Sequence, residues 1–208
     1  GSSALRSEGT AEALDPSVRW DDERKDCGEQ EGGGYAYLAT LAYALRDDAL
    51  EVRLRATNTG DAPLPFGLGL HPFFPLHGGV LLQAPAQEVW SNDGRSPLPT
   101  ERIAVPPAWD FRTPRELPAG GLNHAFRRWN GLATIAWPAL ELRLHIASDA
   151  DAYVLYVPDG GDFFCFEPVD HPINAVHLPG GALAHGMTEL APGAALERRF
   201  AFRVEEDT

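Results

Sequence analysis

Apolar and polar side chains alternate along much of this chain with a period of two. The clearest case is residues 50–56, where Leu, Val, Leu and Ala are separated by Glu, Arg and Arg. This period is typical of a strand with one buried face, because successive side chains of a strand point to opposite sides. Residues 140–147 and 196–204 show the same alternation. We predict half-buried strands at all three places.

Shorter apolar segments between turn-forming residues predict further strands. They lie at residues 35–43, 64–70, 80–84, 87–90, 102–105, 134–137, 153–157, 163–167 and 188–190. Prolines between residues 97 and 118 exclude long helices there, and no amphipathic helix longer than about two turns is visible elsewhere. Many short strands joined by Gly- and Pro-rich turns indicate an all-β fold, a β-sandwich or a barrel.

The first 34 residues differ from the rest of the chain. They are rich in acidic residues and glycine and have few periodic apolar positions. We therefore predict an irregular N-terminal segment over residues 1–34. Residues 35–208 are expected to form one β-domain, since all-β chains of this length are often single domains.

Composition and charge limit the classes of binding partner that are expected. The net charge is −13, from 17 basic and 30 acidic residues, which argues against nucleic acid and against an anionic membrane surface. No apolar run approaches the ~18–20 residues of a membrane span, and no signal peptide is visible, so a cytoplasmic location is expected. An uncharged small molecule is the partner that fits best. A monomer and a homodimer both remain open.

The stretch from Phe163 to Ala175 concentrates the candidate chemistry. An apolar run, Phe-Phe-Cys-Phe, ends at Glu167, which is followed by two prolines and Asn174. A carboxylate at a rigid strand end beside apolar surface is a candidate for a raised pKa and for the role of general base. The alternative is a strand-end glutamate that faces water. Cys165 is expected to be a buried free thiol.

A second stretch, His71-Pro72-Phe73-Phe74-Pro75, follows two glycines of a predicted strand. Its two aromatic residues could floor a pocket beside His71. The alternative is a histidine that merely packs against aromatic residues. No HxH, HExxH or CxxC spacing occurs, so no metal site is predicted. Phosphate-binding and GxSxG motifs are also absent, which leaves acid–base chemistry on a ligand such as a sugar.

These motifs together resemble the aldose 1-epimerase, or galactose mutarotase-like, family. The matching pieces are residues 58–60 (Asn-Thr-Gly), 65–74 (Pro-Phe-Gly-Leu-Gly-Leu-His-Pro-Phe-Phe), 163–175 and the closing 190–193 (Leu-Ala-Pro-Gly). The resemblance covers Tyr35 to the C-terminus. It implies a large antiparallel β-sandwich and the interconversion of the α and β anomers of a free aldose, without a cofactor. The family's N-terminal part finds no counterpart, so an N-terminally shortened member is expected.

The resemblance also assigns site residues. It implies that His71 is the general acid and Glu167 the general base. It implies substrate-binding roles for Asn123, His124, Phe73 and Asn174. Asn123-His124 stands where the family has an Asp-His pair, so one carboxylate that bonds sugar hydroxyls is replaced by an amide.

Two further hypotheses remain beside the enzyme. The chain could be a carbohydrate-binding or regulatory protein of the same fold without catalysis, because fold alone does not fix function. It could also be a truncated product with an incomplete pocket. His71 and Glu167 favour the enzyme, whereas Asn123 and the missing N-terminal elements favour the binding protein.

Overall fold

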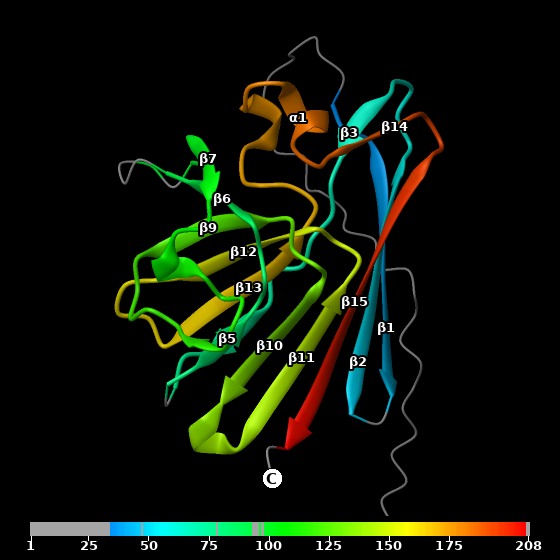
Figure 1. Cartoon of the computed structure of the whole chain (residues 1–208). Helices are drawn as coiled ribbons and strands as arrows, with labels where there is room; N and C mark the ends of the chain where they lie inside the picture. Colours follow the sequence, from blue (N-terminus) through cyan, green and yellow to red (C-terminus); the bar gives the residue numbers. More distant parts are fainter. Residues whose placement is uncertain (1–33, 47, 78, 93–95, 97, 207–208) are drawn as a thin grey trace, which may run out of the picture.

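The computed structural model describes residues 34–46, 48–77, 79–92, 96 and 98–206. The predicted irregular segment 1–34 therefore lies, apart from Gly34, outside the described residues. The described chain is made mainly of antiparallel strands (Figure 1). The predicted antiparallel β-sandwich of the galactose mutarotase-like type is confirmed.

The larger sheet has seven strands. They are β1 (Tyr37–Arg46), β2 (Ala49–Asn58), β5 (Leu81–Gln83), β8 (Arg115–Glu116), β10 (Leu132–Trp137), β11 (Leu142–Ser148) and β15 (Ala195–Glu206). Their order across the sheet is β1-β2-β15-β11-β10-β5-β8. The last strand of the chain thus lies beside β2, and the two ends of the described chain meet in one sheet.

The second sheet has six strands and carries the candidate site. They are β4 (Phe73–Pro75), β6 (Glu88–Ser91), β7 (Glu101–Ala104), β9 (Leu122–Arg127), β12 (Ala152–Val157) and β13 (Phe163–Val169). Their order is β4-β13-β12-β9-β6-β7. A small third sheet pairs β3 (Leu64–Phe66) with β14 (Thr188–Leu190).

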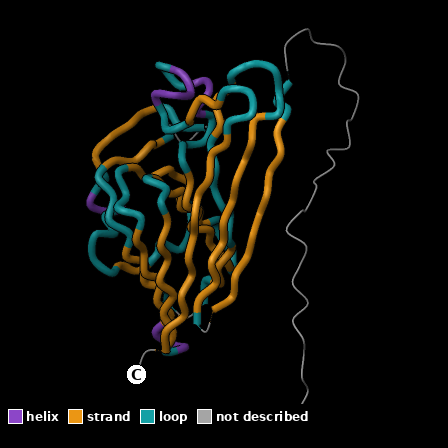
Figure 2. The backbone as a smooth tube through the Cα atoms, turned by 90° about the vertical axis from the view of Figure 1, so that its right-hand side faces the viewer, coloured by secondary structure: helices purple, strands orange, loops and turns teal. Residues whose placement is uncertain are grey.

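Helical segments are short throughout the described chain. They are the 3₁₀ helices η1 (Pro107–Trp109), η2 (Pro138–Leu140) and η3 (Ala175–His177) and the α-helix α1 (Gly181–Ala184). In the view of Figure 2 the strands run side by side, and helical turns lie at the top, at the bottom and at the left edge of them. None of the described helices is long and apolar enough to cross a lipid bilayer.

The main core lies where one face of the six-stranded sheet meets the larger sheet. Phe126, Tyr153 and Phe166, on three neighbouring strands, stack there with ring centroids 4.8 and 4.6 Å apart. Tyr153 is fully buried, and its hydroxyl donates a 3.0 Å hydrogen bond to the carbonyl of Ala84, just after β5. Aromatic packing and a satisfied hydroxyl together stabilise the contact between the sheets.

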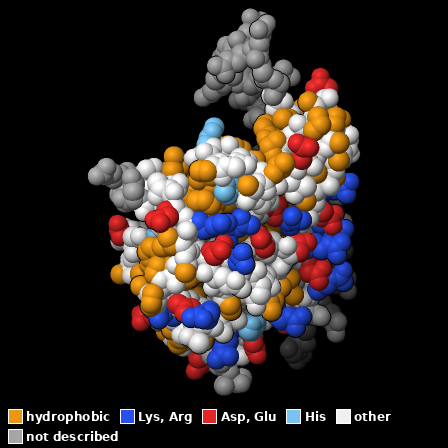
Figure 3. Space-filling view, turned by 45° about the horizontal axis from the view of Figure 1, so that its top comes forward, with side chains coloured by type: hydrophobic (Ala, Val, Ile, Leu, Met, Phe, Trp, Pro, Cys, Tyr) orange, Lys and Arg blue, Asp and Glu red, His pale blue; other side chains and the backbone are white. Residues whose placement is uncertain are grey.

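The alternation of β13 sets which of its residues face the core. Phe164 and Phe166 lie in the core, so Cys165 and Glu167 point to the outer face of the six-stranded sheet. On the larger sheet, acidic and basic side chains alternate with the core positions in the same way. On the face of the molecule shown in Figure 3, acidic and basic side chains lie interspersed.

One predicted strand ends earlier than expected. The pattern predicts a strand over residues 64–70, but β3 ends at Phe66. Residues 67–70 leave the small sheet and run beside the end of β13 instead, where Gly69 and Val169 form an isolated bridge. This departure brings the next residue, His71, to the six-stranded sheet.

Candidate active site

His71 reaches the site because the segment before it is bonded to the end of β13. The amide of Leu70 donates to the carbonyl of Pro168 at 3.1 Å, and the amide of Asp170 donates to the carbonyl of Leu68 at 2.9 Å. These bonds flank the bridge between Gly69 and the end of β13. They fix the backbone of the two functional stretches in one register.

The two glycines of this segment permit the close approach. A Cβ at Gly67 would lie 2.1 Å from Cδ2 of His171. A Cβ at Gly69 would lie 2.6 Å from Cγ1 of Val169. A larger residue at Gly69 would push the chain away from β13, whereas one at Gly67 would displace the side chain of His171.

Asp170 anchors the segment 67–70, which precedes His71. Its carboxylate is 3% exposed and accepts two hydrogen bonds, from the amide of Leu68 at 2.9 Å and from Nε of Arg198 at 2.6 Å. Arg198 lies on β15, in the other sheet. Asp170 therefore connects the chain that carries His71 to both layers of the fold.

The candidate acid and base lie side by side on the outer face of the six-stranded sheet. Nε2 of His71 is 3.3 Å from Oε1 of Glu167. The His71 side chain is 57% exposed, whereas that of Glu167 is 12% exposed. The structure thus places an accessible imidazole directly against a mostly buried carboxylate.

Aromatic rings support the imidazole. The ring of His71 stacks on Phe73 with centroids 5.0 Å apart and an interplanar angle of 28°, and Phe73 contacts Phe163 at 5.1 Å. The expectation that both aromatic residues after His71 floor the pocket is wrong for Phe74. Phe74 points to the core and packs against Phe164 at 5.5 Å, because neighbouring residues of a strand face opposite sides.

Burial controls the titration of the groups on this face. It raises the pKa of Glu167, while the nearby charge of His71 acts in the opposite direction. Burial, together with the charge of Glu167, raises the pKa of the Cys165 thiol to about 11. A raised carboxylate pKa makes Glu167 a stronger base at neutral pH than an exposed glutamate.

Titration of Glu167 tests this electrostatic picture directly. We expect its midpoint, followed by carboxyl ¹³C NMR, above the ordinary glutamate value of about 4.3. In His71→Asn the midpoint should rise further, because a cation that favours the carboxylate is lost. A folded-state pKa above the unfolded one favours folding at low pH, and this contribution is lost as the pH rises through the folded-state value. A midpoint at or below the ordinary value would contradict the assignment.

The other predicted substrate-binding residues lie on different parts of the fold. Asn123 faces the outer side of the sheet, in the row that runs through Tyr156 and Cys165 to Phe73. Asn174 follows β13 in a left-handed conformation, with φ 62° and ψ 24°, at the start of η3.

The structure does not bring His124 to this face. It alternates with Asn123, is 7% exposed and packs against Trp109 with centroids 4.4 Å apart, on the core side of the sheet. Burial lowers the pKa of its imidazole. We therefore leave His124 out of the proposed sugar contacts.

Part of the outer face is covered by the chain after β13. Leu178, between η3 and α1, packs on Trp90, Ala125 and Val154. A small cavity of about 10 Å³ remains beside this cover, lined by Trp90, Asn92, Pro99, Asn123, Ala125 and Ile173. His71 and Phe73 are 57% and 62% exposed, so a ligand can reach His71 from solvent.

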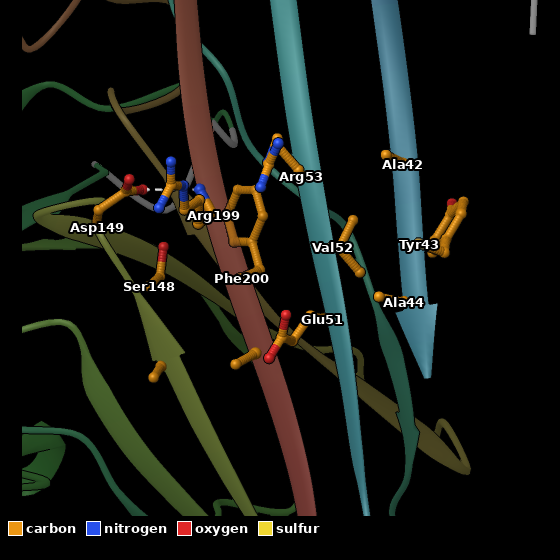
Figure 4. Close-up of a pocket in the computed structure, with 12 residues that line it drawn as sticks. Ala42, Tyr43, Ala44, Glu51, Val52, Arg53, Ser148, Asp149, Arg199 and Phe200 are labelled. Atoms are coloured by element: carbon orange, nitrogen blue, oxygen red, sulfur yellow. Dashed lines mark hydrogen bonds between the residues drawn. The ribbon is translucent and has the colours of Figure 1, made fainter. Parts of the chain in front are cut away.

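A larger hollow of about 660 Å³ lies on the seven-stranded sheet, across β1, β2, β15 and β11 (Figure 4). Its charged side chains already have partners. The carboxylate of Asp149 accepts a 3.0 Å hydrogen bond from the backbone amide of Arg199. The side chains of Arg53 and Arg199 form ion pairs with Glu197, at 3.6 and 3.3 Å. Its lining contains no histidine, so it offers no acid–base pair like that of His71 and Glu167.

Comparison with known proteins identifies the family. The sequence profile of the aldose 1-epimerase family, "Aldose_epim", matches residues 8–203, so the chain belongs to this family. The match begins well before Tyr35, where the resemblance read from the motifs starts.

Individual relatives agree with this result. The chain is 33% identical over 186 residues to the Escherichia coli (strain K12) protein YphB, itself described as uncharacterized, and the match covers 85% of this chain and 63% of YphB. A crystal structure from E. coli K12, described as a candidate aldose 1-epimerase, superposes with a TM-score of 0.77 at 33% identity, covering 86% of this chain and 64% of that one.

A more distant structure shares the fold. Galactose 1-epimerase from Lactobacillus acidophilus NCFM superposes with a TM-score of 0.65 at 21% identity, covering 84% of this chain and 58% of that one. The chain spans less than two thirds of the length of these relatives.

Proposed function

We propose that this chain is an aldose 1-epimerase that interconverts the α and β anomers of a free aldose. Family membership supports a carbohydrate epimerase. The observation that carries the finer assignment is the 3.3 Å approach of His71 Nε2 to Glu167 Oε1 on an open sheet face. No cofactor is required for this chemistry.

The geometry suits the two oxygens of a cyclic sugar that must exchange protons. The ring oxygen and the anomeric hydroxyl are bonded to the same carbon, so an acid and a base must act within a few ångströms of each other. In the proposed reaction, His71 donates a proton to the ring oxygen, and Glu167 removes the proton of the hydroxyl on C1.

Ring opening then follows from these two proton transfers. The bond between C1 and the ring oxygen breaks, and C1 becomes an aldehyde. Rotation about the C1–C2 bond presents the other face of the aldehyde, and the ring closes with the two proton transfers reversed. Asn123, Phe73 and Asn174 are proposed to contact the sugar, with Phe73 offering an apolar face to its C–H groups.

Polarimetry tests this proposal. Freshly dissolved α-glucose and α-galactose approach their equilibrium rotation slowly in buffer. We expect the purified chain to accelerate that approach for at least one aldose. Absence of acceleration with a panel of aldoses, in a sample shown to be folded by circular dichroism, would reject catalysis.

A carbohydrate-binding protein without catalysis is the second candidate. One observation favours it: Asn123 stands where the family resemblance has an aspartate, so a charged contact to sugar hydroxyls is replaced by an amide. Saturable sugar binding by calorimetry, without accelerated mutarotation, would support this alternative.

A further inference from the structure

Cys165 lies beside the proposed acid–base pair, although the epimerase mechanism gives it no task. The ligand atoms of His71, Cys165 and Glu167 all lie within 4.8 Å of one another. Cys165 is fully buried and free of any disulfide. It projects from β13 on the same face as Glu167, two residues before it.

These three side chains offer the donor set that suits zinc. Thiolate sulfur, imidazole nitrogen and carboxylate oxygen are its usual protein ligands, commonly with a fourth position left open. Calcium and magnesium prefer six or more oxygen ligands, so this set disfavours them. Two nitrogen or oxygen ligands of a tetrahedral Zn²⁺ lie about 3.3–3.4 Å apart, as follows from metal–ligand distances near 2.0–2.1 Å.

The observed geometry is close to that arrangement. His71 Nε2 and Glu167 Oε1 are 3.3 Å apart, so these two ligands need little movement. The sulfur of Cys165 lies within 4.8 Å of both the His71 nitrogen and the Glu167 oxygen. The three atoms together would supply three of the four ligands of a tetrahedral metal ion. The exposed side of His71 leaves the fourth position to water or to a sugar hydroxyl.

We propose that His71, Cys165 and Glu167 form an inhibitory site for a thiophilic divalent cation such as Zn²⁺ or Cd²⁺. On binding, the Cys165 thiol releases its proton to the buffer, and its sulfur forms a bond to the metal. Thiolate and carboxylate together balance the two positive charges of the ion. The metal occupies the His71 nitrogen and the Glu167 oxygen that the epimerase reaction uses, so binding excludes catalysis.

Direct binding measurements test the site independently of any epimerase activity. The untagged full chain is titrated with Cd²⁺, and the ultraviolet charge-transfer absorption of a Cd²⁺–thiolate bond is followed. The sequence has two cysteines, and Cys27 is the other one, which makes Cys27→Ser the matched control. We expect one ion per chain in the wild type and in Cys27→Ser.

Cys165→Ser should lose the charge-transfer signal and weaken Zn²⁺ binding, measured by calorimetry, by at least about tenfold. His71→Asn should weaken binding as well. Cys165→Ala, checked for folding by circular dichroism, replaces Cys165→Ser if the latter does not fold. Retained binding in the Cys165 variants, or a signal that depends on Cys27, would overturn the proposal.

Polarimetry adds the functional half of the test, and this half rests on the proposed function. Micromolar Zn²⁺ should slow mutarotation by the wild type and Cys27→Ser, while Cys165→Ser keeps its activity and resists the metal. Cd²⁺ binding through Cys165 in a chain without activity would uphold the site and reject the epimerase. Mutarotase activity without Cd²⁺ binding through Cys165 would uphold the epimerase and reject the metal site.

Discussion

Glu167→Gln is expected to reduce mutarotation by about 10²- to 10⁴-fold, the range typical of losing a positioned general base. The amide keeps the size of the side chain but cannot accept the proton of the anomeric hydroxyl. Polarimetry with α-galactose and α-glucose measures the effect. His71→Asn should cause a loss of similar size, because it removes the proton donor.

Stability should separate this loss from misfolding. Burial penalises the charged form of Glu167, so a neutral amide removes that penalty, and the Tm of Glu167→Gln should be no lower than that of the wild type. Glu101→Gln, at an exposed position of β7 in the same sheet, is the matched control and should keep full activity. Full activity in both Glu167→Gln and His71→Asn would show that the reaction is carried out elsewhere.

Much of the fold was predictable because one face of many strands is buried. Residues 50–56 alternate cleanly, and β2 spans Ala49–Asn58. The end of the strand predicted over residues 64–70 was not predictable in this way. Gly67 and Gly69 have no side chains, so they add nothing to the alternation of apolar and polar positions. Only the contacts with β13 show that the chain leaves the small sheet and runs beside the six-stranded sheet.

The face on which a residue lies was harder to predict where both faces are buried. In β9, Leu122, His124, Ala125 and Phe126 are all buried, so apolar and polar positions do not alternate. For this reason no strand was predicted over residues 122–127, and His124 was not separated from Asn123, although in β9 they point to opposite sides of the sheet. Apolar and polar residues alternate clearly only in strands that have one face exposed to solvent.

The contacts that position the site could not be predicted from the sequence, because their partners are distant along the chain. Nothing near Asp170 in sequence indicates that Arg198 and the amide of Leu68 bond to it. The proximity of Cys165 to His71 depends equally on tertiary structure. Spacing rules for metal ligands detect only ligands that are close in sequence. Here the imidazole of His71 comes from a segment far from Cys165 and Glu167, so these rules could not find the cluster.

Asp170→Ala is expected to lower the free energy of unfolding by about 3 kcal/mol, near the lower end of the range for removing one partner of a buried ion pair. The substitution leaves the guanidinium of Arg198, 23% exposed, without its carboxylate. It also leaves the amide of Leu68 without its acceptor. Urea unfolding followed by tryptophan fluorescence measures the change.

Two further variants isolate the cause of this loss. Asp48→Ala breaks the ion pair with Arg203, whose side chains are 52% and 64% exposed, and should cost about 0.5 kcal/mol or less. Asp170→Asn retains an oxygen for the Leu68 amide and should fall between the two. Because Leu68 lies three residues before His71, we also expect Asp170→Ala to slow mutarotation under conditions where it is fully folded. An unfolding midpoint equal to that of Asp48→Ala would show that Asp170 does not anchor the segment that carries His71.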